Sequence, residues 1–161
     1  MPPVDKTLAS RYGTPLESPG FLLWHVSNRW QRQQRHALRD LGLTHVQFVL
    51  LAGIAWLGRN RQPVTQTQLA QHAQTDPMMT SQVVRTLESK GLIERKPLPR
   101  DTRAKSLRVT PRGQRVVREA MVLVERTDAA FFAALDESPT HLVNLLRQLL
   151  GTGDAPATDD R

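Results

Sequence analysis

The sequence contains no cysteine. Disulfide bonds, zinc sites with thiolate ligands, cysteine nucleophiles and cysteine-based oxidant sensors are therefore excluded. The chain also has no uncharged apolar run near the roughly 18 residues that a membrane-spanning helix needs. Its N-terminal stretch, MPPVDKTLASRYGTP, lacks the apolar segment of a secretory signal peptide. We therefore expect a cytoplasmic protein with no membrane partner.

Motifs of enzyme active sites are missing as well. The sequence has no glycine-rich phosphate loop, no nucleophile elbow and no paired carboxylates at a catalytic spacing, and Ser81 has no histidine within helical reach. The five histidines are scattered, and His25 and His36 stand about three helical turns apart, which is too far to share a metal ion. We expect no enzyme activity, no cofactor and no metal.

Positive charge is concentrated in one part of the chain. The 161 residues, 39% of them hydrophobic, carry a net charge of +7 and suit a single domain. Residues 85–118 contain eleven basic and three acidic residues, a local net charge of +8, so the remainder of the chain is close to neutral. Such clustering favours a nucleic-acid partner over a general role in solubility.

The starts of the helices are marked by capping signals. A proline directly after an N-cap residue favours a helix start, because its missing N–H would have no partner there. Four such pairs occur: Ser18-Pro19, Asp76-Pro77, Thr110-Pro111 and Ser138-Pro139. Capping boxes predict two more starts, at Thr44 with Gln47 and at Thr65 with Gln68, the second beside a Val64–Leu69 hydrophobic staple. The fold is predicted to be mainly α with a small β-hairpin wing.

These signals, combined with apolar periodicity, divide the chain into elements. The predicted helices span residues 19–41, 44–57, 65–74, 77–90, 111–135 and 139–149. The helix at 44–57 is apolar nearly all round, Trp56 included, and is predicted to be the core. Extended runs at 92–96 and 106–110 flank the basic loop 97–105 and predict a hairpin with an open tip. Residues 1–17 are predicted to be a flexible tail and 151–161 a disordered one.

The two short helices with a tight turn between them, followed by the hairpin, have the layout of a winged helix-turn-helix. This module places its second helix in the DNA major groove. That helix turns Thr80, Val83, Val84 and Leu87 inward. Glutamine pairs with adenine, arginine with guanine or phosphate, and methionine contacts thymine methyls. The predicted DNA-contacting residues on its outer side and margin are Met78, Met79, Ser81, Gln82, Arg85, Thr86 and Ser89. A solvated amphipathic helix is the alternative if this helix is taken alone.

The hairpin is the second candidate DNA contact. An arginine at a wing tip can enter a narrow minor groove, and we predict that Asp101 holds Arg103 by a charge-assisted hydrogen bond. Thr65 and Gln66, at the start of the preceding helix, are predicted to support the contact. The predicted wing residues are Arg95, Arg100, Asp101, Arg103 and Lys105. An ordinary charged surface loop is the alternative.

The segment DPMMTSQVVRTLESKGL, followed by IERKPLPRDTRAKSLRVTPRG, resembles the MarR family of winged-helix regulators. Spacing and residue type agree across residues 76–113, and the order of helices elsewhere agrees too. The resemblance therefore covers nearly the whole chain. It is carried by Leu87-Glu88, Gly91-Leu92-Ile93, Arg95, Asp101-Thr102-Arg103, Leu107-Arg108-Val109 and Thr110-Pro111-Arg112-Gly113.

The resemblance implies one domain over residues 18–150, in which 18–41 and 112–150 are dimerisation helices and 44–111 form the winged helix-turn-helix. It implies a homodimer that binds double-stranded DNA at a roughly palindromic operator, usually as a repressor. It also implies release by a small effector, often an aromatic acid. A regulator without ligand control, or a non-specific DNA-binding or protein-interaction module, is the alternative.

Four side chains lie near the effector pocket that the resemblance implies: Trp24, His25, Trp30 and Trp56, all on the first two predicted helices. Tryptophans in such helices also serve as plain core or interface residues. Both roles remain open for these positions.

Overall fold

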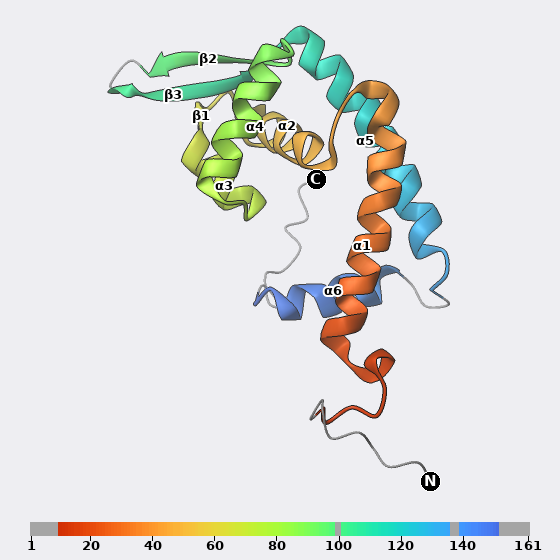
Figure 1. Cartoon of the computed structure of the whole chain (residues 1–161). Coiled ribbons are helices and arrows are strands. Elements are labelled where there is room, and N and C mark those ends of the chain that lie inside the picture. Colours follow the sequence, from red (N-terminus) through yellow and green to blue (C-terminus); the bar gives the residue numbers. More distant parts are fainter. Residues whose placement is uncertain (1–9, 99–100, 136–138, 152–161) are drawn as a thin grey trace. The chain divides into compact units, whose positions relative to one another are not determined.

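The computed structural model describes residues 10–98, 101–135 and 139–151, without the side chains of 101–104 (Figure 1). The chain divides into two compact units, Met1–Val124 and Glu125–Arg161. Short 3-10 turns occur at η1 (Pro15–Glu17), η2 (Arg39–Leu41) and η3 (Gly58–Asn60). The other elements are α1 (Pro19–Leu38), α2 (His45–Leu57), β1 (Val64–Thr65), α3 (Gln66–Ala73), α4 (Pro77–Ser89), β2 (Ile93–Leu98), β3 (Asp101–Val109), α5 (Pro111–Phe132) and α6 (Pro139–Leu149).

The first two helices begin where their capping signals predict. Ser18 caps α1 by accepting a hydrogen bond from Phe21 N (3.4 Å). The Thr44–Gln47 capping box is formed in both directions, at 3.2 and 3.3 Å. The α-helical part of α1 ends at Leu38 and not at Leu41, because the chain tightens into η2 before Gly42. Gly42 adopts a left-handed φ of +64°, which glycine accepts without steric cost.

The core of the first unit forms around α2, which contacts α3, α4 and β3 (Figure 1). Leu50, Leu51 and Ile54 on α2 are at most 1% exposed. Each buried side chain of this size contributes about 1.5–3 kcal/mol of hydrophobic stabilisation. Burial does not extend all round the helix as predicted, since Trp56 is 58% exposed. The side of α2 that carries Trp56 faces away from the core.

The wing belongs to a three-stranded antiparallel sheet in the order β1-β3-β2. The sequence predicts only a two-stranded hairpin, so β1 is an addition. Val64 pairs with Leu107 and Thr65 with Ser106. Val64 and Leu107 are both 2% exposed, so this short strand joins the start of α3 to the wing through the core.

The strands of the wing are longer than predicted. β2 continues to Leu98 and β3 begins at Asp101, and these two residues are paired, so most of the predicted loop 97–105 is strand. Pro97 is accommodated because β2 lies at the edge of the sheet, where a missing N–H is tolerated, and the register shifts beside it. Residues 99 and 100 lie outside the described residues.

The last two helices also follow their predicted starts. Thr110 Oγ1 accepts a hydrogen bond from Gly113 N (3.0 Å) at the beginning of α5. α5 ends at Phe132, three residues before the predicted Leu135. Within the second unit, α6 begins at Pro139 as predicted, whereas its predicted cap, Ser138, lies outside the described residues.

The predicted tails are described only in part. Residues 1–9 and 152–161 lie outside the described residues. The remainder of the predicted N-terminal tail contains η1, where Gly13 N donates to Glu17 Oε2 (2.8 Å). No single helix in the described ranges is long and apolar enough to cross a membrane. The segments Pro19–Leu41 and His45–Asn60, which are bent by 75° relative to each other, pass this test of length and composition only when they are counted together. Buried core helices pass the same test.

Candidate nucleic-acid interface

Hydrogen bonds fix the start of α3 and the start of α4, on either side of the short helix that precedes the turn. The second predicted capping box is formed, with Gln68 N donating to Thr65 Oγ1 (3.2 Å) and Thr65 N to Gln68 Oε1 (2.9 Å). Gln74 ends α3 in a left-handed conformation, with φ +51°. Asp76 Oδ1 then accepts from the N–H groups of Met78 and Met79, both at 2.9 Å, and starts α4 as predicted.

This arrangement assigns different tasks to the two predicted support residues. Thr65 is partly buried and uses its backbone and hydroxyl to start α3. Gln66 is partly buried as well and lines a hollow of about 470 Å³ along α3 and the turn. Thr80 stabilises the same turn from inside, because its hydroxyl lies 2.8 Å from both the Thr75 hydroxyl and the Asp76 carbonyl oxygen.

α4 has the two-sided character that its sequence predicts. Its inward residues Thr80, Val83, Val84 and Leu87 are buried. The outward residues are exposed at Met78, Met79, Gln82, Arg85 and Ser89, and partly buried at Ser81 and Thr86. Met78 is 83% exposed, so its apolar side chain is accessible to a partner.

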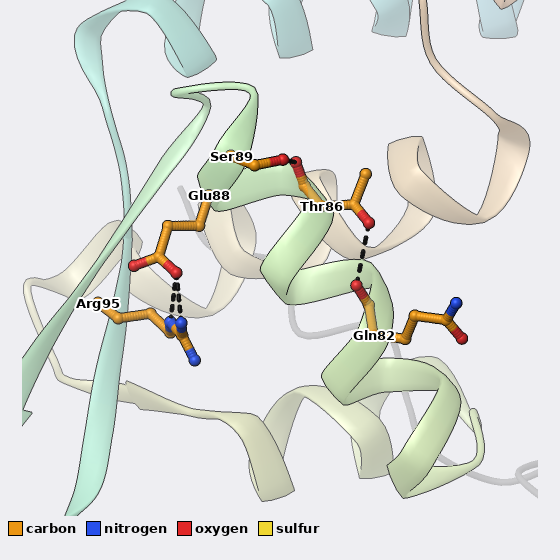
Figure 2. Close-up of polar contacts among 5 residues, drawn as sticks. All are labelled: Gln82, Thr86, Glu88, Ser89 and Arg95. Atoms are coloured by element: carbon orange, nitrogen blue, oxygen red, sulfur yellow. Dashed lines mark hydrogen bonds and ion pairs between the residues drawn. The ribbon is translucent and has the colours of Figure 1, made fainter.

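The polar side chains on the outer side of α4 differ in how they are engaged. Thr86 donates its hydroxyl hydrogen to the Gln82 carbonyl (3.1 Å), and Ser89 donates to the Thr86 carbonyl (2.9 Å) (Figure 2). The side chains of Gln82 and Arg85 have no bonding partner in the described ranges. Gln82 and Arg85 are therefore exposed polar groups on this side with all their donors available to a partner.

Arg95, a predicted wing contact, is bound to α4. Its Nε donates to Glu88 Oε2 (2.7 Å), and its Nη2 forms an ion pair with the same oxygen (Figure 2). The hydrogen bond from Arg95 lowers the pKa of Glu88, against a smaller opposing effect of desolvation, and Lys105 adds to the lowering. The pair fixes β2 to α4, so Arg95 positions the helix whether or not it also contacts DNA.

The other predicted wing residues are only partly described. Lys105 is exposed on β3. Arg100 and the side chains of Asp101 and Arg103 lie outside the described residues, so the predicted Asp101–Arg103 hydrogen bond stays a prediction. The backbone places residues 101 and 103 at the beginning of β3, next to the wing tip.

The C-terminal end of α4 is held by contacts that the sequence analysis missed. Lys90 Nζ donates to the Gly42 carbonyl (2.6 Å) and to Gln47 Oε1 (2.8 Å), which ties α4 to the corner between α1 and α2. Arg112 Nη1 donates to the Lys90 carbonyl (3.0 Å), and Thr110 donates to the Gly91 carbonyl (2.8 Å). A basic residue in the last turn of a predicted helix was the available signal, but its partners are distant in sequence.

The four residues predicted to line an effector pocket have separate neighbours. Trp24 is 66% and Trp56 58% exposed. The His25 ring lies 4.3 Å from the ring of Phe21, and the Trp30 ring lies 4.9 Å from the ring of His45. The Arg59 guanidinium stacks on Trp56 at 4.0 Å. None of the four lines the hollow along α3 or the cavity between the end of α2 and β3.

A different cavity, of about 380 Å³, lies between the end of α2 and β3. It is lined by residues of α2, of the loop after it, of β3 and of the first turn of α5. The sequence shows Arg59 and Arg61 in the loop 58–63, but it does not show that this loop lies beside β3. Within the described part of the chain, no group of three histidine, aspartate or glutamate residues is arranged to hold a metal ion.

Known proteins resemble this chain in sequence and in structure. A profile of the MarR family matches residues 43–105. The uncharacterised HTH-type transcriptional regulator YdcH of Bacillus subtilis is 46% identical over 136 residues, which cover 84% of this chain and 92% of that protein.

Two solved structures share the fold, with similar sequence identities and TM-scores. A variant of Escherichia coli MarR in complex with operator DNA is 26% identical, with a TM-score of 0.72, covering 81% of this chain and 92% of the other. CouR from Rhodococcus jostii RHA1, bound to p-coumaroyl-CoA, is 25% identical, with a TM-score of 0.75, covering 92% of this chain and all of the other. The identity with the Bacillus protein extends well beyond the winged helix-turn-helix. The chain belongs to the MarR family of winged helix-turn-helix transcriptional regulators.

Proposed function

We propose that the protein is a homodimeric repressor that binds a palindromic operator through α4 and leaves it when a small organic ligand binds. The observation that carries this proposal is the outer side of α4. There the exposed Gln82, Arg85 and Met78 stand opposite a fully buried apolar side. A glutamine or arginine that pairs with a base through two hydrogen bonds provides about 1–3 kcal/mol of discrimination against a wrong base.

The electrostatics of the same region support DNA as the partner. Residues 85–118, which include most of α4, the wing and the start of α5, carry a net charge of +8. Release of the counterions that surround DNA makes such a surface bind strongly at low salt and weakly at high salt. The α4 residues then select the sequence, while the surrounding lysines and arginines provide affinity without selecting it.

The exposed apolar side chains support a dimer. In α1 the residues Phe21 to Trp24 and Val26 are 38–66% exposed. In α6, in the other unit, Val143, Leu145, Leu146 and Leu149 are 41–78% exposed. Apolar side chains that are exposed in a cluster on each of these helices are typical of an interface, and a second copy of the chain would cover the same side chains on both partners. Two-fold symmetry would place two α4 helices roughly 34 Å apart, which matches one turn of DNA.

Repression and ligand control rest on the likeness to two regulators. E. coli MarR was solved with operator DNA and CouR with p-coumaroyl-CoA, so proteins of this fold bind both kinds of partner. A dimer that occupies two adjacent half-sites prevents another protein from using the same stretch of DNA. We therefore assign repression by occupancy, and release through a ligand that binds the DNA-free form more tightly.

The proposed function is tested by fluorescence anisotropy with a duplex that the protein selects from a random pool. We expect affinity for this duplex to fall steeply with salt and to exceed the affinity for a scrambled duplex of equal length. The double variant Gln82→Ala/Arg85→Ala should bind at least about tenfold more weakly, a loss of about 1.4 kcal/mol. Arg32→Ala removes an exposed arginine from α1 and serves as the matched control, with affinity within about twofold of the wild type. Undiminished binding by the double variant would overturn the proposal.

A further inference from the structure

Oxidisable sulfur in this protein is confined to methionine. The chain has four methionines and no cysteine, so a peroxide meets no thiol that would react before a thioether. Among the methionines whose side chains the structure describes, Met78 is 83% exposed, whereas Met79 and Met121 are 39% and 37% exposed. Met78 therefore presents the most accessible sulfur of these three, and it presents it on the outer side of α4.

The backbone of Met78 is fixed in the first turn of α4. Its N–H and that of Met79 both donate to Asp76 Oδ1 at 2.9 Å. Pro77 precedes it at the start of the helix, where a proline is already in the helical conformation. The sulfur takes no part in these contacts. A chemical change at the sulfur would therefore alter the outer surface of α4 without removing the contacts that start the helix.

Gln82 stands one helical turn after Met78 on the same side of α4. Residues four apart in a helix are neighbours, with roughly 5–6 Å between their Cβ atoms. Side chains in a helix lean toward its N-terminus, so the Gln82 side chain leans over the turn that carries Met78. Thr86 binds only the backbone carbonyl of Gln82 (3.1 Å), and the Gln82 amide has no partner among the described residues (Figure 2). A thioether is a weak acceptor, so it leaves this amide available to a base.

The neighbouring methionine lacks such a partner. The residue one turn after Met79 is Val83, which is apolar and 8% exposed. A new acceptor on the sulfur of Met79 would find no donor there. The two adjacent methionines therefore differ both in access to an oxidant and in what an oxidised side chain could bind.

We propose that Met78 is an oxidation site whose sulfoxide withdraws the Gln82 amide from DNA. The sulfur lone pair attacks one oxygen of hydrogen peroxide, and an S–O bond forms as the O–O bond breaks. The proton on the new S–O group passes to the departing hydroxide, which leaves as water. The sulfur loses two electrons and the peroxide gains them. The sulfoxide oxygen is a strong acceptor, and it binds the Gln82 amide hydrogens in place of a base.

Oxidation of Met78 would weaken DNA binding in two ways. It places a polar group where an apolar side chain would contact a thymine methyl, and it occupies the donors of Gln82. Both effects rest on the proposed function, whereas the rapid oxidation of Met78 and its contact with Gln82 do not. Methionine sulfoxide is reduced enzymatically, so the change is reversible.

The oxidation site is tested without DNA. The full chain is treated with dilute hydrogen peroxide and sampled over time by peptide mass spectrometry, with Met78→Leu and Met79→Leu separating the adjacent methionines. We expect Met78 to oxidise at least about twofold faster than Met79 or Met121, because reaction follows exposure. In NMR spectra the side-chain amide of Gln82, assigned with Gln82→Ala, should shift on oxidation of the wild type but not of Met78→Leu. Oxidation of Met78 no faster than the others, or an unmoved amide, would overturn the proposal.

The effect on DNA is measured as the ratio of affinities for the selected duplex before and after peroxide, so each protein is compared with itself. The wild type should bind at least about tenfold more weakly after treatment. Met121→Leu keeps both methionines of α4 and should lose as much. Met78→Leu should change by less than about twofold, and Gln82→Ala by less than about threefold, because it has no amide to withdraw. Equal losses in the wild type and Gln82→Ala would contradict the proposed contact.

Reversal and folding complete the test. Methionine sulfoxide reductases should restore the affinity of the oxidised wild type to within about twofold. Its melting temperature should stay within about 2 °C of the untreated protein, because the cap at Asp76 is retained. A loss of affinity that Met78→Leu shares, or that accompanies unfolding, would show that Met78 is not the site. Failure of the untreated protein to bind any duplex would count against the proposed function alone.

Discussion

Among the single side chains of α4, Gln82 is best suited to identify a base pair, because its amide is exposed and both donates and accepts. We expect Gln82→Ala to lose about 1–3 kcal/mol of discrimination at one base pair of each half-site, with preferences elsewhere unchanged. Anisotropy titrations against duplexes with single base-pair changes measure this loss. Arg32→Ala, an exposed position on α1 outside the proposed DNA contact, is the control. Unaltered preferences at every base pair in Gln82→Ala would refute the role.

The Glu88–Arg95 pair makes stability depend on pH. Arg95 lowers the pKa of Glu88 below the ordinary 4.5, so the folded protein favours the carboxylate more than the unfolded chain does. The resulting stabilisation is fully present above the ordinary pKa and is lost as the pH falls through the lowered folded value. The pair is partly exposed, with side-chain exposures of 26% and 35%, which limits the contribution to less than about 1 kcal/mol.

This pH dependence can be measured with Glu88→Gln, which removes the charge and keeps the shape. At pH 7 the variant should unfold at a lower urea concentration than the wild type. The difference between the two proteins should shrink as the pH falls through the lowered pKa of Glu88, because the folded protein then loses the carboxylate as well. A difference that stays constant or grows on acidification would show that the pair does not act in this way.

At the level of elements, the local signals of the sequence were sufficient for the helix starts. Thr44, Thr65 and Asp76 accept the predicted hydrogen bonds because a cap and its partners lie within three residues. β1 was missed because it is two residues long and Thr65 is also the cap of α3. The partners of Lys90 were missed because they are 43 and 48 residues away. A capping signal carries no information about such distant contacts.

Gly113 determines how closely α5 approaches the strand before it. A Cβ atom at this position would lie 2.0 Å from the Leu92 carbonyl oxygen and 2.7 Å from Val109 Cγ1. Gly113→Ala should therefore destabilise the protein by about 1–3 kcal/mol, although alanine is the better helix former. Gly20→Ala in α1 meets no atom within 4 Å and should be neutral or stabilising by up to roughly 1 kcal/mol. Urea unfolding of both variants measures the contrast, and a Gly113→Ala protein as stable as Gly20→Ala would contradict the account.

For the whole molecule, the sequence predicted the fold class and the family correctly, whereas the assignment of the effector-pocket residues stays a prediction. The pattern of caps and apolar periods is shared by proteins of this fold, so it identifies the architecture. The exposure of Trp24 and Trp56, at 66% and 58%, depends on how helices pack, and periodicity does not report this. The cavity between the end of α2 and β3 combines residues from four segments, which only the folded chain places together.

The proposed dimer is tested on the exposed apolar side of α6. Leu145 and Leu149, four residues apart, lie on one side of the helix and are 44% and 78% exposed. We expect Leu145→Glu/Leu149→Glu to weaken dimerisation at least about tenfold and to weaken operator binding with it, because the interface would have to bury two carboxylates. Sedimentation equilibrium measures the dimer dissociation constant.

A matched control adds the same two charges on the same helix. Asn144→Glu/Gln148→Glu changes exposed polar positions with the same spacing and should dimerise within about threefold of the wild type. A wild-type protein that sediments as a monomer would exclude the dimer. Equal dissociation constants for the two double variants would exclude α6 as the interface.

The central claim, that two α4 helices related by two-fold symmetry select a DNA sequence, is tested most directly by selecting bound duplexes from a random pool with the full chain. We expect the enriched sequences to be two-fold symmetric, with half-site centres about one helical turn, or roughly 10 base pairs, apart. Enrichment of a single asymmetric site, or of no sequence at all, would contradict the claim.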